Sequence, residues 1–510
     1  MAGRLRNEIL GMEARFRINP QTNRYELVLR GSGNNTAETE RALEWMRLAL
    51  ASPDWRIENL PRIRDLVEQE LGAVRNTMQR PEEAWVEDPA RAWLFQDQPL
   101  LLATSSFLTR EHNLFRLHWM LKPAGAPDIQ AFLESLGRVR GSRGELEAAL
   151  HSVEQGHDPG MDTLSASSKT LATEAARDLA TLLPEIPDSS LAQDWAALCT
   201  EMRRGLATGP VNTLRALDAV RHSLLIACGA RLFLIASSQS QAALEPSLTE
   251  FPKLLRDAKL SKAVYSANRS IEERLRARDS SATHPLFVGL LNPNSQGGVF
   301  LNSAPAAGYR DAGTDSLLDF LASLLYAGRG AHGVFMKTWS AGLAYSNGIR
   351  VRPFDSRVSY YAERTPLLPQ TLEFVIGEIQ KAQPDPALVD YAIAGAFGGT
   401  RSAESYEDRG EAMAEDLADG LTPEVVARFH RAVLDLRKRP DLTHELFRRL
   451  PLVAERILPG MGRHVNEVPG SVYFVIGPTK QLDAYEQYLQ KTEGPATRLF
   501  RLYPRDLWME

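Results

Sequence analysis

The sequence of 510 residues contains little of several things that mark particular protein classes. Only two cysteines are present, Cys199 and Cys228, which excludes a disulfide framework and a four-cysteine metal site. Lysine and arginine number 59 against 64 acidic residues, so a net charge of −5 gives no electrostatic basis for binding nucleic acid or an anionic membrane. No apolar run approaches the roughly 20 residues that cross a bilayer, and the N-terminus lacks the apolar core of a signal peptide. We therefore expect a cytoplasmic protein without a nucleic-acid or membrane partner.

Motifs of the common hydrolases are also absent. None of the ten histidines lies in H-x-x-E-H or H-E-x-x-H, and no G-x-S-x-G elbow occurs. His151 and His157 come nearest to a metal-binding pair, but a separation of six residues turns one imidazole about 240° from the other on a helix. The sequence therefore predicts no catalytic residue and no metal ligand in this chain.

What the chain does contain is typical of a globular protein. Hydrophobic residues make up 44% of it and charged residues 24%. A chain of 510 residues is too long for a single hydrophobic core, so the length favours two domains. Repeated patterns along the chain agree with that number.

A paired-strand pattern followed by an amphipathic helix occurs once in each half. Apolar residues alternate on both sides of an Asn-Pro turn in residues 13–33, and a similar alternation runs through residues 342–365. Asn35 can cap a helix in the first half. The apolar positions of the two helices correspond at a spacing of 329 residues (372 minus 43), and they are Leu43, Met46 and Leu50 in the first and Leu372, Val375 and Ile379 in the second.

A second correspondence lies nearer the end of each half. Residues 230–241 and 471–481 each read as a strand that breaks into small residues before an amphipathic helix, at a spacing of 241 (471 minus 230). The spacing is thus 88 shorter than for the first pair (329 minus 241), which places extra residues in the first copy. Residues 126–215, which read as helices broken by Gly, Ser and Pro, are the candidate insertion.

These correspondences predict an α+β fold made by duplication of one unit. We expect two homologous α/β sandwich domains, each an antiparallel-rich sheet packed with helices, at residues 1–258 and 259–510, with the helical insertion at about 126–215 in the first. The alternative is two unrelated domains that share a strand-then-helix order.

The two predicted copies do not begin at the same point. Before its hairpin, the second copy has a strand pattern in residues 297–309, a helix pattern in 314–326 and a glycine-rich stretch, and nothing corresponding precedes residue 12. The first domain is therefore expected to lack an opening strand and helix and to show an open sheet edge, which proteins normally cover. We expect the chain to continue from, or dock onto, another polypeptide.

Three stretches carry a resemblance to a known family. GAHGVFMKTWSAGLAYSNG, YYAERTPLLPQTLEFVIGEI and SVYFVIGPTKQLDAYEQYL resemble the last domain of the pitrilysin/insulinase family of zinc peptidases, particularly its presequence-protease branch, and ELVLRGSG with the helices after it resembles the preceding domain. The resemblance implies four homologous domains, two per half, that close around an unfolded peptide, with H-x-x-E-H in the first. This chain resembles only the second half.

The resemblance also implies a site within residues 337–348. A Gly-Ala-Tyr segment of the family supplies a tyrosine that hydrogen-bonds the substrate backbone near the zinc, with an arginine six or seven residues earlier. Tyr345 matches the tyrosine, but Trp339 and Thr338 occupy the arginine positions and the nearest base is Lys337. Lysine lacks the planar fork of arginine, so this departure weakens the case for direct catalytic assistance.

We therefore expect a substrate-binding segment, whose candidate residues are Tyr345, Lys337, Gly342 and Asn347. The structural alternative is a hairpin turn at Asn347 and Gly348 with Tyr345 packed on the sheet. Three further residues, Tyr360, Tyr361 and Arg364, are expected to serve strand packing.

The leading functional hypothesis is the non-catalytic C-terminal half, or a separate subunit, of a zinc metallopeptidase that encloses and degrades unfolded peptides. It expects no cofactor in this chain, zinc in a catalytic half that carries H-x-x-E-H, and two partners, that half and the peptide. One alternative is an inactive peptidase paralogue that acts as a scaffold or assembly subunit. Another is an independent hydrolase whose metal ligands are dispersed in the sequence.

Overall fold

Helices and strands are mixed along the chain, which confirms the predicted α+β class. The protein is represented by a computed structural model that describes a set of ranges: 8–19, 22, 24–79, 85, 88–123, 125–258, 270–282, 286–311, 313–398, 405–462 and 470–509. Within them, no helix is both long and apolar enough to span a membrane. Two sheets are present in these ranges, a six-stranded one in the second half and a two-stranded one in the first.

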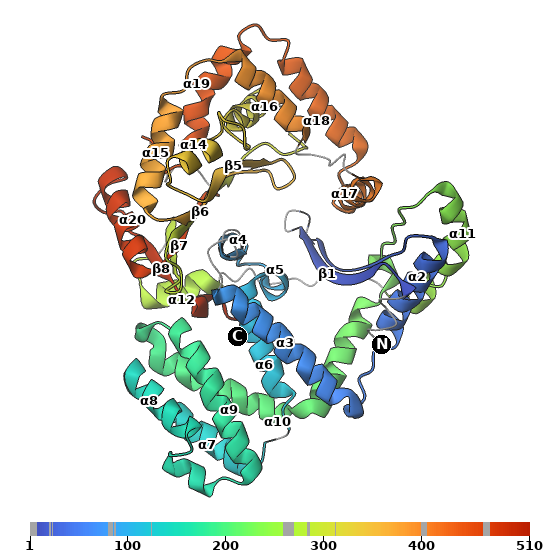
Figure 1. The fold of residues 1–510 in the computed structure, drawn as a ribbon, viewed down its shortest axis with the longest axis vertical. Coiled ribbons are helices and arrows are strands. Elements are labelled where there is room, and N and C mark those ends of the chain that lie inside the picture. The colour runs from blue at the N-terminus through green and yellow to red at the C-terminus, as the bar shows by residue number, and fades with distance from the viewer. Residues whose placement is uncertain are drawn as a thin grey trace.

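The six-stranded sheet is mixed and has the strand order β5-β6-β4-β7-β3-β8 (Figure 1). Neighbours β5 to β7 pair antiparallel, whereas β3 is parallel to both β7 and β8. The strand bounds are β3 Phe287–Leu291, β4 Gly298–Pro305, β5 Ser346–Arg352, β6 Arg357–Thr365, β7 Val472–Gly477 and β8 Phe500–Leu502.

Both faces of this sheet are buried, as the alternation along β7 shows. Tyr473 and Val475 point into a core formed with helices of the second half, while Phe474 and Ile476 point into a second core on the opposite face. The helices of the first core are α13 Thr314–Leu324, α15 Leu368–Gln380, α16 Pro386–Gly398, α18 Pro423–Leu436, α19 Leu442–Ala454 and α20 Thr479–Thr492.

The opposite face is covered by α12 (Ser270–Arg278) and by helices from the first half. Residues such as Val74, Trp93 and Leu108 pack there against Val288 and Phe474. The helices on this side are α3 Leu60–Gln79, α4 Asp88–Leu94, α5 Pro99–Ser105, α6 Phe107–Met120 and α12 Ser270–Arg278. The two halves of the sequence therefore share one buried sheet.

The first half begins with a β-hairpin and a helix, as predicted. Strand β1 (Gly11–Asn19) pairs antiparallel with β2 (Arg24–Ser32), and α2 (Thr36–Ala51) follows. The side chain of Asn35 accepts a hydrogen bond from the Glu38 backbone, which is the predicted cap.

Residues 127–224 are largely helical, and the insertion expected at about 126–215 stays a prediction. These helices share a core with Trp119 of α6 and the distant Trp508, and Trp195 is among the residues that they contribute. Helix α10 is kinked at Gly209, which has a φ of 67° and precedes Pro210. The helices are α7 Pro127–Arg138, α8 Arg143–Glu154, α9 Ala166–Leu182 and α10 Leu191–Leu224.

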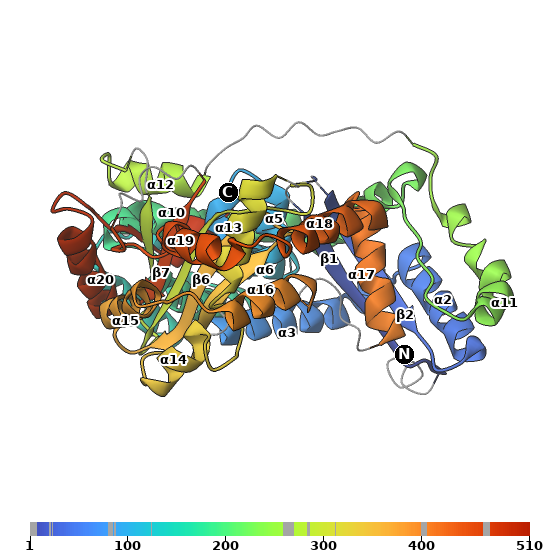
Figure 2. The same ribbon diagram turned by 90° about the horizontal axis from the view of Figure 1, so that it is seen from above.

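The hairpin lies between helices α17 (Tyr406–Ala418) and α2. Helix α17, from the second half, lies on one face of the hairpin, and α2 lies on the other with α11 (Ser238–Leu248) beside it (Figures 1 and 2). Alternate residues of the strands explain this arrangement. Arg15 and Arg30 form ion pairs with Glu411 of α17, whereas Met12 and Leu29 pack with the apolar residues of α2.

Two local predictions are wrong. Residues 230–237 form no strand, although α11 follows them as expected. The hairpin turn predicted at Asn347 and Gly348 lies elsewhere, because both residues are inside β5 and the chain turns at residues 353–356. The homology of the two units and the division at residue 258 stay predictions.

Candidate functional site

A groove opens at one end of the six-stranded sheet, where three connections meet. It lies beside the β3–β4 loop, the segment between α14 (Val334–Ser340) and β5, and the end of β6. Its volume is about 810 Å³, within the range of ligand-binding clefts. The lining residues are Asn294, Ser295, Gln296, Gly297, Trp339, Gly342, Ala344, Tyr345, Arg364 and Pro366.

Tyr345 is one of the residues that line this groove. Its side chain is 57% exposed, and its ring lies beneath the guanidinium of Arg364 at 4.7 Å from the ring centroid to Cζ. The register of β5 and β6 pairs Ser346 with Glu363, so one further residue places Tyr345 opposite Arg364. The cation–π contact holds both side chains at the mouth of the groove.

The backbone at this site is unusual at two points. Gly342 has a φ of 71°, a conformation that glycine adopts without steric cost. Arg364 has a φ of 47°, which an L-residue with a long side chain rarely adopts and which costs on the order of 1–3 kcal/mol. Such strain is often found at binding sites, because the surrounding structure must hold the residue in place.

The four candidate residues from the sequence are not all brought together. Tyr345 and Gly342 line the groove, but Lys337 does not and instead places its ammonium 2.7 Å from Glu378. This contact holds the pKa of Glu378 below its usual value. Asn347 is 1% exposed within β5 and donates to the carbonyl of Phe335.

From the sequence, Arg364 is expected to serve strand packing together with Tyr360 and Tyr361. Tyr360 and Tyr361 are buried on opposite faces of the sheet, which confirms packing for both. Arg364 instead lies at the groove. The signal that could have found it is the strand register, since a turn at 353–356 places residue 364 opposite residue 345.

The chemistry of the lining is that of a binding surface. Asn294 and Gln296 offer exposed amides, Trp339 is 54% exposed, and Arg364 supplies a cation. Among the residues that the structure describes, the groove is lined by no histidine, cysteine, aspartate, glutamate or lysine. The arrangement can hydrogen-bond and stack, but it offers no side chain suited to general acid–base work near neutral pH.

A second hollow, of about 540 Å³, lies between α6, α10 and the C-terminal segment. Its histidine, His112, is buried, with Nε2 2.8 Å from a Glu201 carboxylate oxygen and its ring stacked on Trp508 at 4.5 Å. These contacts fix the histidine in the interface between the insertion and the C-terminus, so we interpret the pair as structural. Across the described ranges, no three His, Cys, Asp or Glu side chains are grouped so that they could hold a metal ion.

Comparison with known proteins gives distant likenesses only. No family model matches the chain, and no curated protein matches it. Among solved structures, the inactive domain of a peptidase M16 from Pseudomonas fluorescens is similar at 12% identity and a TM-score of 0.41, over 94% of this chain and 84% of that one. A protease from Helicobacter pylori is similar at 13% identity and a TM-score of 0.32, over 48% and 53%.

A conserved protein from Enterococcus faecalis V583 is similar at 13% identity and a TM-score of 0.29, over 76% of this chain and 74% of that one. At these identities and TM-scores, none of the likenesses assigns the chain to a family or gives it an activity.

Proposed function

We propose that this chain is the non-catalytic half, or a separate subunit, of a zinc metallopeptidase that encloses and degrades unfolded peptides. In this proposal the groove at Tyr345 contacts the peptide, and the zinc is held by a partner that carries H-x-x-E-H. The observation that carries the proposal is the lining of the groove, where Tyr345, Arg364 and two amides offer hydrogen bonds without a catalytic acid or base.

This lining suits the backbone of an extended peptide. Peptide carbonyls accept hydrogen bonds from the guanidinium of Arg364 and the hydroxyl of Tyr345, and the amides of Asn294 and Gln296 can both donate and accept. Contacts of this kind do not depend on the side chains of the substrate. The groove would therefore bind many sequences with little selectivity.

Arg364 offers a substitute for the arginine that the family pattern has before its tyrosine. The sequence has Trp339 and Thr338 where the family has an arginine before its tyrosine, and Lys337 is paired with Glu378. Arg364 reaches the tyrosine from the neighbouring strand instead. A guanidinium thus lies beside Tyr345 although no arginine precedes it within the motif.

Peptide binding by the purified chain tests the proposal. Fluorescence anisotropy with a labelled unstructured peptide should show weak binding, and mass spectrometry should show the peptide uncut. Replacing Arg364 by alanine should weaken binding by about tenfold, because hydrogen bonds to charged groups contribute about 1.5–3 kcal/mol each. Tyr345→Phe should weaken it less, since only the hydroxyl is lost.

Two surface substitutions serve as matched controls. Arg437→Ala and Tyr406→Phe remove the same chemical groups from exposed positions elsewhere, just after α18 and at the start of α17. Both should leave the affinity unchanged. Equal affinity of the Arg364→Ala variant and the unchanged chain would contradict the assignment of the groove, and a chain that assembles with partners but binds no peptide would favour the scaffold alternative.

A further inference from the structure

The hairpin of the first half presents a strand edge that no described strand covers. β1 and β2 form a sheet of two strands, so the edge of β2 opposite β1 has no partner strand within the described residues. Every second residue of β2 directs its backbone N–H and C=O toward that edge. An isolated two-stranded hairpin is marginally stable, and an unpaired edge is a template for another strand.

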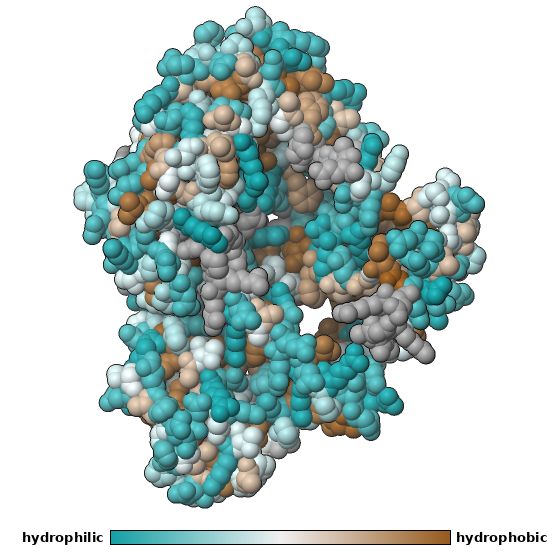
Figure 3. Space-filling view, viewed as in Figure 1, coloured by the Kyte–Doolittle hydropathy of each residue, from teal (hydrophilic) through white to brown (hydrophobic). Residues whose placement is uncertain are grey.

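Residues 231–235 run beside this edge without pairing with it. Nε of Arg231 lies 3.3 Å from a carboxylate oxygen of Glu26 in β2, so the segment is within side-chain reach of the strand. No backbone hydrogen bond between the two is present among the described residues. Leu232, Phe233 and Ile235 are 45–49% exposed, and Figure 3 shows hydrophobic residues on this side of the molecule near α11.

The side chains of this segment nevertheless alternate as those of a strand do. Arg231 donates to the carbonyl of Ala418 at the end of α17, and Ile235 lies against Gly410 of the same helix. Leu234 points the other way and packs with the apolar residues of α2 and α11. Residues 231 and 235 thus share the face on which Glu26 and Arg30 lie, and residue 234 shares the face of Leu29.

The six-stranded sheet shows what lies at the corresponding place. There β6 is the second strand of a hairpin and β7 precedes a helix, just as β2 and residues 231–235 do in the first half. Between β6 and β7 lies β4, which pairs antiparallel with both. In the first half no described strand takes the place of β4.

We infer that the first half accepts a β-strand from another polypeptide, which adds antiparallel to the edge of β2 and reaches toward residues 231–235. This inference does not depend on the proposed function, because it concerns a different surface of the chain. It explains why residues 231–235 expose apolar side chains and alternate like a strand although they pair with no strand among the described residues.

The two faces of the site define the chemistry of the added strand. Toward α2 its neighbours would be Leu27 and Leu29 on one side and Leu234 on the other. Toward α17 they would be Glu26, Arg30 and Arg231. The partner segment should therefore span about five to six residues, with apolar side chains at alternate positions and polar ones between them.

Residues directly before β1 do not reach this place. The backbone N–H of Leu10 bonds to the carbonyl of Ser32, so the chain enters the hairpin on the β1 side, and β2 lies between that entry and the free edge. Residues 8–10 are therefore excluded as the source of the added strand.

A tethered strand tests the inference on the full chain. The β4 sequence, residues 298–305, is joined to the N-terminus by a flexible Gly/Ser linker, which raises its effective concentration at the edge. The control carries the same tether with Val299→Pro and Leu301→Pro in the added copy, so that it cannot donate those hydrogen bonds. Hydrogen exchange is then measured in residues 24–32 and 231–235.

The expected result is that exchange in both segments slows by about tenfold or more with the tether and not with its proline control. Equal exchange with the two tethers would overturn the inference. A third outcome, protection of the untethered chain that rises with its concentration together with dimers in light scattering, would support the inference and identify the other polypeptide as a second copy of this chain. None of these results alters peptide affinity at Tyr345, so the inference and the proposed function fail separately.

Discussion

The two cysteines differ in burial and should therefore differ in the reactivity of their thiols. Cys199 is 1% exposed, and burial raises the pKa of its thiol to about 12, whereas Cys228 is exposed. Because the thiolate is the reactive form, we expect a thiol-specific label to modify the native chain once, at Cys228, and twice after unfolding. Mass spectrometry counts the labels. A Cys228→Ser chain that is still labelled rapidly in its native state would contradict the burial of Cys199.

His118 predicts a pH dependence of stability. Burial, with the Lys122 ammonium, lowers the pKa of His118 to about 4 from its ordinary value near 6.5. As the pH falls from about 6.5 to about 4, His118 therefore binds a proton in the unfolded chain but stays neutral in the folded chain. The free energy of unfolding should decrease over this range, by about 2–3 kcal/mol at its end.

The matched experiment compares two histidine variants. Urea unfolding at pH 7 and pH 5 should show a smaller loss of stability for His118→Gln than for the unchanged chain. His444→Gln, at an exposed position in α19, should behave like the unchanged chain. An identical pH dependence of all three would show that His118 titrates normally.

Some residues of the groove at Tyr345 could be predicted from the sequence and others could not, for a physical reason. Tyr345 and Gly342 are close together in the chain, so one motif identified both. Arg364 lies across the hairpin, and its relation to Tyr345 depends on where the chain turns. The Asn-Gly pair at 347–348 indicated the wrong turn, because its turn preference is weaker than the pairing of β5 with β6.

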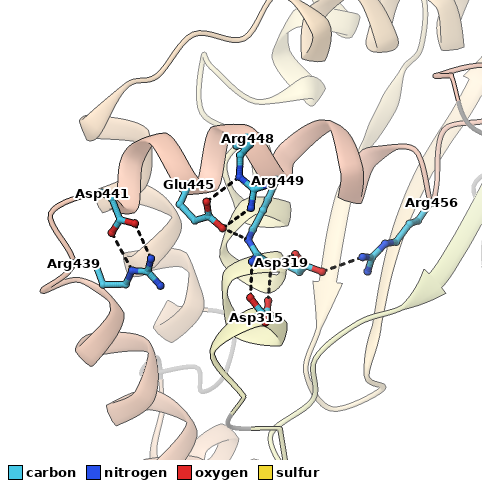
Figure 4. A network of polar contacts seen from close by, with 8 residues as sticks. All are labelled: Asp315, Asp319, Arg439, Asp441, Glu445, Arg448, Arg449 and Arg456. Carbon is cyan, nitrogen blue, oxygen red and sulfur yellow. Dashed lines mark hydrogen bonds and ion pairs between the residues drawn. The ribbon is translucent and has the colours of Figure 1, made fainter.

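Arg449 of α19 adds ion pairs to the apolar contact between α13 and α19 (Figure 4). The side chain of Arg449 is 14% exposed and lies within 2.8 Å of three carboxylates, those of Asp315, Asp319 and Glu445. Arg449→Met should lower the free energy of unfolding by about 1–2 kcal/mol, since it leaves three like charges without their common partner.

Arg439 provides the control for this prediction. It pairs with Asp441 alone, and both side chains are at least 36% exposed. Arg439→Met should change stability by less than about 0.5 kcal/mol. Chemical unfolding of the two variants measures the difference in stability. Equal effects would mean that the ion pairs of Arg449 (Figure 4) do not stabilise the contact of α13 with α19.

The hairpin is tied to the second half by a buried ion pair. Arg24 in β2 contacts both oxygens of Asp419 at 2.6 and 2.9 Å, and the two side chains are 8% and 1% exposed. Asp419→Ala leaves the Arg24 cation buried, which should cost about 3 kcal/mol. Hydrogen exchange in residues 11–32 should speed up, while β7 in the sheet core stays protected.

The exposed pair of Arg437 and Asp390 is the control for this contact. Asp390→Ala should leave exchange in residues 11–32 unchanged. If Asp419→Ala also leaves this exchange unchanged, the hairpin does not depend on the ion pair of Arg24 with Asp419.

Hairpins and helices could be predicted because their patterns are local. The cap at Asn35 and the spacing of apolar residues predicted α2, and the spacing of apolar residues predicted α15. Residues 230–237 have the composition of a strand but form none, since a strand exists only with a neighbour to bond it. A periodic pattern therefore indicates a preference and does not supply the partner.

For the whole molecule, the sequence predicted the α+β class but not the packing of its halves. The alternation in β7 indicates that both sheet faces are buried, yet it does not show that α3 and α6 of the first half cover one of them. Contacts between residues several hundred positions apart leave no local signal. The shared core implies that residues 270–510 would expose a large apolar face if they were produced alone.

The measurement that tests the account most directly is purification of the native chain from its own source, with mass spectrometry of what accompanies it and a peptidase assay of each part. The account predicts a partner with H-x-x-E-H in equal amount, and hydrolysis of unfolded peptides that needs both polypeptides and falls with Arg364→Ala. A chain that purifies without such a partner, or that cuts peptides by itself, would contradict it.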